Sequence, residues 1–136
     1  MKKTTLICLL SLLAAGAVQA STPCDNFQIN IKNQLSDDLL ATTAKLNGAS
    51  IKPDGIQKLK SKSSQVFTVS KSQSDVPMYG EFSFNTISLP TKNVTIKFDL
   101  NNAGVICKHD DKTESGDLSV EKTRLPNQVE YIISDK

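Results

Sequence analysis

The residues best suited to chemistry in this chain are its one histidine and the acidic residues that follow it. His109 is followed by Asp110 and Asp111, with Glu114 and Asp117 a few positions later. Imidazole nitrogens and carboxylate oxygens are ligands of zinc and calcium. The spacing matches neither the zinc pairings nor the calcium loop with its fixed glycine and terminal glutamate. His109, Asp110 and Asp111 are therefore candidate metal ligands, and a solvated polar loop over this stretch is the simpler interpretation.

Catalytic residues are not evident. Hydrolysis by a nucleophile requires a base that a third group orients, and the one histidine cannot reveal such a set. No Gly-x-Ser-x-Gly motif is present. A pair of carboxylates, as in glycosidases, remains open because spatial neighbours are invisible in a sequence. We therefore expect no enzyme and no cofactor.

The segment Met1–Ala20 has the parts of a secretory signal peptide. Lys2 and Lys3 precede an apolar run, and Val18 and Ala20 occupy the two small-residue positions before a cleavage site. The apolar run is shorter than the roughly 20 residues of a membrane-spanning helix. These features predict cleavage after Ala20, a bacterial product that is secreted or periplasmic, and no transmembrane anchor.

Export determines the state of the cysteines, because disulfides persist in the periplasm and outside the cell. Cys8 lies inside the signal segment, which leaves Cys24 and Cys107 as a pair in the mature chain. We expect these two cysteines to form one disulfide, and a reactive thiol or a metal ligand is the alternative.

Charge limits the partners of the mature chain. Loss of Lys2 and Lys3 from the 16 basic residues leaves a number equal to the 14 acidic residues. A neutral chain with a single arginine lacks the basic surface that nucleic-acid binding requires. One basic segment, KLKSKSS, is a possible contact for an anionic surface through Lys58, Lys60 and Lys62. A solvated loop, or an edge strand kept from pairing by its lysines, is the alternative.

Alternation of apolar and polar residues predicts strands along the mature chain. In Lys92–Cys107 the alternation is followed by Asn101–Gly104, a run of turn-forming residues, so this stretch predicts a hairpin that ends in Cys107. The same pattern elsewhere predicts a core of ten side chains: Phe27, Ile29, Ile31, Phe67, Phe82, Phe84, Val94, Ile96, Phe98 and Tyr131.

Residues 39–46 fit either a strand or a short helix, because apolar residues occupy both parities. We favour a strand, since Thr42 and Thr43 are weak helix formers and Asn47-Gly48 is a hairpin signal. In total, 7 to 9 short strands are expected over a single domain, residues 21–136. The predicted fold is an all-β, antiparallel β-sandwich, immunoglobulin-like or aegerolysin-like, with one disulfide.

The order of several segments resembles that of the aegerolysin family of small secreted β-sandwich proteins. The segments are Ile29–Asn33, Lys45–Gly48, Ser63–Phe67, Tyr79–Phe84 and Val94–Asp99. Phe98-Asp99 stands where that family has a Trp-Asp pair, and this chain contains no tryptophan. The resemblance covers most of the mature chain up to Gly104, and it implies a protein that recognises membrane lipid.

Elimination predicts the function. Without a catalytic set, a cofactor motif or a basic surface, the chain is expected to be an exported, non-enzymatic binding protein. Its loops or sheet edges would contact a protein or a cell surface, since disulfide-bridged β-scaffolds commonly present such sites. Two alternatives stay open: a membrane-lipid-binding protein of aegerolysin type, and a small periplasmic inhibitor of a host enzyme.

Overall fold

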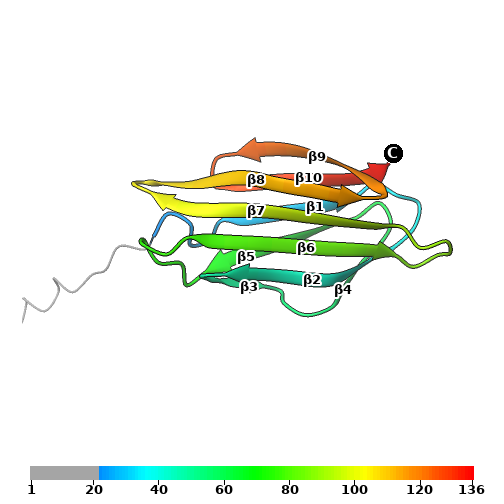
Figure 1. Ribbon diagram of the computed structural model, residues 1–136, viewed down its shortest axis with the longest axis horizontal. Helices are drawn as coiled ribbons and strands as arrows, with labels where there is room; N and C mark the ends of the chain where they lie inside the picture. The colour runs from blue at the N-terminus through cyan, green and yellow to red at the C-terminus, as the bar shows by residue number, and fades with distance from the viewer. Residues whose placement is uncertain (1–21) are drawn as a thin grey trace, which may run out of the picture.

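The computed structural model describes residues 22–136, so the predicted signal peptide, Met1–Ala20, lies outside the described residues. In the described part, ten β-strands form two five-stranded sheets that pack face to face (Figure 1). The prediction of an all-β sandwich with one disulfide is confirmed. The strands number one more than the upper end of the expected range.

The first sheet has the strand order β3-β5-β1-β10-β9. Its strands are β1 (Gln28–Asn33), β3 (Ser50–Lys52), β5 (Ser64–Ser70), β9 (Leu118–Leu125) and β10 (Gln128–Asp135). β1 and β10 run parallel, with Gln28 opposite Gln128, and the other neighbouring strands run antiparallel. The first and last strands of the chain therefore lie side by side within this sheet.

The second sheet has the strand order β4-β2-β6-β7-β8 and is antiparallel throughout. Its strands are β2 (Leu39–Asn47), β4 (Gln57–Leu59), β6 (Met78–Thr86), β7 (Asn93–Ala103) and β8 (Ile106–Gly116). The favoured strand assignment for residues 39–46 is confirmed by β2. The hairpin expected at Asn47-Gly48 is wrong, because β2 and β3 belong to different sheets. An Asn-Gly pair favours a tight turn, and here the turn carries the chain across the sandwich.

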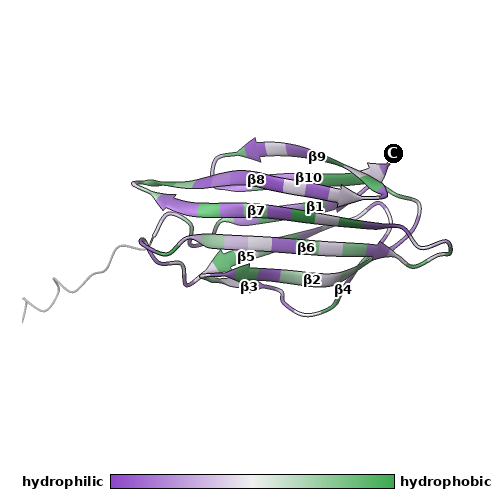
Figure 2. Cartoon of the chain, in the orientation of Figure 1, coloured by the Kyte–Doolittle hydropathy of each residue, from purple (hydrophilic) through white to green (hydrophobic). Residues whose placement is uncertain are grey.

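The polar stretch Asp110–Asp117 is not a loop, because it forms most of β8. The chain reverses at Gly104 and Val105, between Ala103 and Ile106. β8 lies at the edge of its sheet, where charged side chains discourage pairing with other chains, and this explains a strand with so few apolar residues (Figure 2). Its polarity is what made it resemble a loop.

All ten predicted core side chains are buried, none of them more than 2% exposed. Aromatic rings pack between the two sheets and within one of them: the Phe82 ring lies 4.8 Å from that of Phe67 on the other sheet and 5.7 Å from that of Phe98 on the neighbouring strand. Beneath Gly80 the Phe98 ring fills the space of a missing side chain, because a Cβ there would lie 2.1 Å from Phe98 Cζ. A glycine at position 80 therefore leaves the space that the Phe98 ring occupies.

Candidate functional site

A buried polar cluster lies between β8 and β9, which are the neighbouring edges of the two sheets (Figure 1). On β8, His109 pairs with Leu100 and Asp111 pairs with Phe98, and both partners are core residues. Paired residues share a face of the sheet, so His109 and Asp111 point inward. Asp110 lies between them on the opposite face. The structure thus brings together two of the three candidate metal ligands and separates the third.

Tyr131 connects the two inward residues. Its hydroxyl donates a hydrogen bond to Asp111 Oδ1 at 3.0 Å and lies 2.6 Å from His109 Nε2. Lys122, which is opposite Tyr131 on β9, forms an ion pair with Asp111. Because the single phenolic proton is directed at Asp111, Nε2 of His109 is the donor to Tyr131 and Nδ1 is an acceptor. Nδ1 is buried and has no hydrogen-bond partner among residues 22–136.

The cluster is neutral at its histidine and its tyrosine. Burial, assisted by the positive charges of Arg124 and Lys122, lowers the pKa of His109 to about 4. Burial also raises the pKa of Tyr131, with the charge of Glu114 as a smaller cause. The sequence placed Tyr131 in the core through its alternation, but nothing in the sequence indicated its contact with His109.

Metal binding gains no support from this arrangement. Over residues 22–136, no three His, Cys, Asp or Glu side chains come together as a metal site would require. Of the carboxylates near His109, Asp111 is engaged by Tyr131 and Lys122, and Asp110 lies 3.9 Å from Lys108. The geometry is that of a satisfied structural network with one free acceptor, Nδ1 of His109.

Acidification from pH 7 to pH 4 is expected to destabilise the protein through His109. Its pKa is lower in the folded state than in the unfolded state, so the unfolded chain takes up the proton first. The contribution of neutral His109 to the free energy of unfolding is fully present above pH 6.5. It is lost as the pH falls to about 4, a difference of about 3 kcal/mol. Melting temperatures of the wild type and of His109→Gln across this range measure it. The variant should have the flatter profile, and identical profiles would contradict the assignment.

Three exposed apolar side chains lie at the end of the sandwich where β7 turns into β8. Val105 is 92% exposed, Ile106 is 58% exposed and Leu125, at the end of β9, is 48% exposed. Ile106 and Leu125 line one cavity, so the two strands converge there. We call these three residues the apolar rim.

The backbone beside the apolar rim is anchored to the N-terminal segment. The predicted disulfide is present, joining Cys24 to Cys107 over a sequence separation of 83 residues with a Cα–Cα distance of 4.7 Å. Asn102 adds a second link: its Oδ1 accepts from the Cys24 N–H at 2.7 Å, and its Nδ2 donates to the Gln73 carbonyl at 3.0 Å. Since Cys107 directly follows Ile106, the disulfide anchors the backbone next to this residue of the apolar rim.

A cavity of about 220 Å³ opens next to the rim, and we call it the β8–β9 cleft. Its lining residues are Phe27, Ile106, Cys107, Lys108, His109, Asp110, Arg124, Leu125 and Gln128. Arg124 pairs with Val129 two positions beyond Lys122 on β9, and its side chain is exposed. Lys122 has Asp111 as its counter-ion, whereas Arg124 makes no ion pair within the described part of the chain.

The predicted anionic contact lies at the opposite end of the sandwich. Lys58 belongs to β4, and Lys60 and Lys62 lie in the turn before β5. Lys58 Nζ is 3.5 Å from Asp38 Oδ2, and Lys62 Nζ donates to the Gln34 carbonyl at 2.7 Å. The structure brings the three lysines into one region, as the sequence implied, but two of them already contact neighbouring loops.

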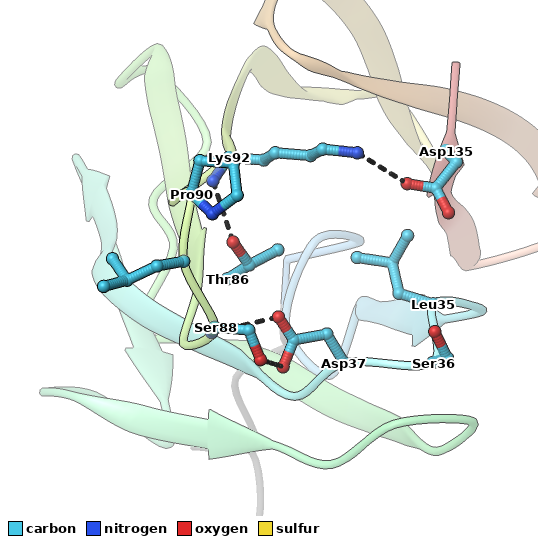
Figure 3. A pocket seen from close by; sticks show the side chains of 9 residues that line it. Leu35, Ser36, Asp37, Thr86, Ser88, Pro90, Lys92 and Asp135 are labelled. Atoms are coloured by element: carbon cyan, nitrogen blue, oxygen red, sulfur yellow. Dashed lines mark hydrogen bonds and ion pairs between the residues drawn. The ribbon is translucent and has the colours of Figure 1, made fainter.

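A second cavity of about 220 Å³ lies at this opposite end (Figure 3). The Asp37 carboxylate accepts hydrogen bonds from the Ser88 N–H at 3.0 Å and from the Ser88 hydroxyl at 2.9 Å. Lys92 Nζ lies 3.3 Å from Asp135 Oδ1. Since Asp37 is hydrogen-bonded to Ser88 and Lys92 is paired with Asp135, the charged groups of this cavity already have partners.

No protein-family model matches this chain, and no curated protein matches its sequence. Over residues 22–136 the structure by itself defines the class: a β-sandwich of ten strands with one disulfide. The disulfide is consistent with an extracellular or periplasmic location. Over residues 22–136 the chain forms no helix long and apolar enough to cross a membrane.

Proposed function

We propose that this protein is an exported, non-enzymatic binding protein that contacts a partner protein through the apolar rim. The observation that supports this proposal most directly is the exposure of Val105. This side chain is 92% exposed at the tip of a hairpin that a disulfide anchors. Neighbouring exposed apolar side chains mark interaction sites when they form a contiguous patch. Anchoring reduces the loss of conformational entropy on binding, so a fixed apolar tip suits tight recognition.

The edge strand β8 is a poorer binding surface than the rim. β8 carries five ionisable side chains between Lys108 and Lys112, and it bulges at Lys112, where Lys97 and Phe98 pair with Thr113 and Asp111. Charges and bulges on an edge strand oppose the addition of another strand. A partner is therefore more favourably bound by side-chain contacts at the end of the sandwich than by strand addition to β8.

Export forms part of this proposal. The signal sequence Met1–Ala20 supports secretion or a periplasmic location, and its short basic start favours a bacterial source. The disulfide between Cys24 and Cys107 supports the same compartments. Inhibition of a host enzyme is one form that binding through a fixed hairpin tip can take.

Lipid recognition, which the aegerolysin resemblance implies, is the second candidate. Val105 and Ile106 are the observation that favours it, because exposed apolar side chains at one end of a molecule can also enter a lipid surface. The two candidates differ in whether binding requires a defined protein or a bilayer.

Replacing Val105 and Ile106 together by aspartate is expected to weaken partner binding at least about tenfold, because each charge disrupts an apolar contact. The partner is first recovered from envelope or host extract with the wild type, and its affinity is then measured with purified components. Leu89→Asp is the matched control, since Leu89 is 87% exposed at the opposite end. An equal loss of affinity for the partner in both variants would contradict the proposal.

Liposome sedimentation separates the candidates. Retention of the wild type on liposomes, lost in the Val105→Asp/Ile106→Asp variant, would favour lipid recognition. Turnover of a glycan or a peptide by the purified protein would overturn the non-enzymatic assignment.

A further inference from the structure

The turn at Asn47-Gly48, which carries the chain from one sheet to the other, is the place where asparagine deamidation meets the least steric hindrance. In this reaction the backbone nitrogen of the next residue attacks the asparagine side-chain amide, and a glycine has no side chain to obstruct the attack. Among the asparagines of the chain, only Asn47 precedes a glycine. Whether the reaction occurs in the native state depends on how the fold holds these two residues.

The fold leaves the Asn47 side chain free to react. Asn47 is exposed at the last position of β2. Its amide group makes no hydrogen bond within residues 22–136. Asn33 shows the opposite situation, because it is buried and its Nδ2 donates to the Asp37 carbonyl at 2.9 Å. Asn47 therefore lacks the contacts that hold an asparagine side chain away from the backbone.

The charges around Asn47 favour the reaction as well. Asn47 lines a cavity whose charged residues are three lysines and two acidic residues: Lys45, Lys97, Lys112, Glu81 and Asp99. Glu81 pairs with Lys45 and Asp99 pairs with Lys112, so Lys97 supplies the excess positive charge. Deamidation starts with loss of a proton from the attacking nitrogen and ends with a new carboxylate. A positive environment stabilises both the anionic nitrogen and the product.

We propose that Asn47 deamidates in the folded protein without an enzyme, which makes this turn a site of covalent modification. The Gly48 nitrogen loses its proton and forms a bond to Asn47 Cγ, the bond between Cγ and Nδ2 breaks, and ammonia leaves with that proton. Water then opens the cyclic imide. Attack of water at Cγ gives aspartate, and attack at the backbone carbonyl carbon of residue 47 gives isoaspartate.

The two products differ in their effect on the fold. Isoaspartate adds a methylene group to the main chain, in a connection where Gly48 and Ala49 alone join β2 to β3. The backbone is tightly placed there: Gly48 has a φ of 91°, and a Cβ on it would lie 2.6 Å from the Pro77 carbonyl oxygen. A longer chain must disturb the last pair of β2, Asn47 with Tyr79. Isoaspartate should therefore lower the melting temperature, whereas aspartate should not.

The test is incubation of the purified protein at mildly alkaline pH, followed by peptide mapping that separates aspartate from isoaspartate. Asn93 is the internal control, because it is also exposed at the end of a strand but precedes the β-branched Val94. In the native protein Asn47 should be converted at least about tenfold faster than Asn93, since a branched side chain crowds the attacking nitrogen. Conversion of Asn47 only in a denatured sample, or equal rates at the two asparagines, would overturn the proposal.

Asn47→Gln is the matched variant, because it keeps a side-chain amide but needs a larger and less favourable ring for the same attack. The wild type should gain the mass that corresponds to exchange of NH for O, and the variant should not. A variant that gains this mass at the wild-type rate would refute the assignment to Asn47. The isoaspartate form, separated by chromatography, should melt below the aspartate form, and equal melting temperatures would refute the effect on the turn.

Discussion

Replacing Cys24 and Cys107 together by alanine is expected to lower the free energy of unfolding by about 4 kcal/mol, and the melting temperature by roughly 15 °C. The disulfide joins residues 83 positions apart, so it restricts the unfolded chain over most of its length. Cys24 is completely buried, and alanine avoids placing a hydroxyl there. Thermal and denaturant unfolding of the two proteins measure the difference.

Reduction of the wild-type disulfide is the control for this substitution. Reduced wild type and the double variant should melt within a few degrees of each other, because both have lost the same covalent constraint. A wild type whose melting temperature does not change on complete reduction would show that the link between the N-terminal segment and β8 contributes nothing to stability.

Phe98→Ala is expected to cost about 3 to 5 kcal/mol, because it removes a buried ring from the centre of the core. The Phe98 ring stacks with Phe82 at 5.7 Å and with His109 at 5.5 Å, so it contacts both the aromatic core and the buried polar cluster. Gly80→Ala in the wild type should cost about 1 to 3 kcal/mol or more, since its Cβ would lie 2.1 Å from the Phe98 ring.

The two substitutions should be strongly non-additive. The Phe98→Ala background lacks the ring, so Gly80→Ala should then cost almost nothing or stabilise the protein. Alanine has less conformational freedom than glycine in the unfolded chain, so it loses less entropy on folding. Gly80 has no positive φ in the structure, so no backbone strain masks the effect. Equal costs of Gly80→Ala in both backgrounds would refute the steric role of Phe98. Denaturant unfolding of the four proteins completes the cycle.

The sequence determined the sandwich, its core and its disulfide. A period of two fixes which side chains share a face of a strand, so the ten core residues from Phe27 to Tyr131 could be assigned without knowing which strands pair. Cys24 and Cys107 are the two cysteines outside the predicted signal segment, and the predicted export implied their oxidation. These inferences rest on local pattern or on counting, and neither depends on strand order.

Only the tertiary structure decided the pairing of strands and therefore the candidate site. The Asn47-Gly48 turn crosses between sheets, and β8 is an edge strand despite its loop-like composition, because both features depend on contacts far away in the sequence. The cleft depends on them too: Arg124 of β9 and His109 of β8 line the same cavity. Strand pairing brings the one histidine and the one arginine to this cavity, although nothing in the sequence connected them. A side chain acquires these neighbours only when strands distant in the chain pack together.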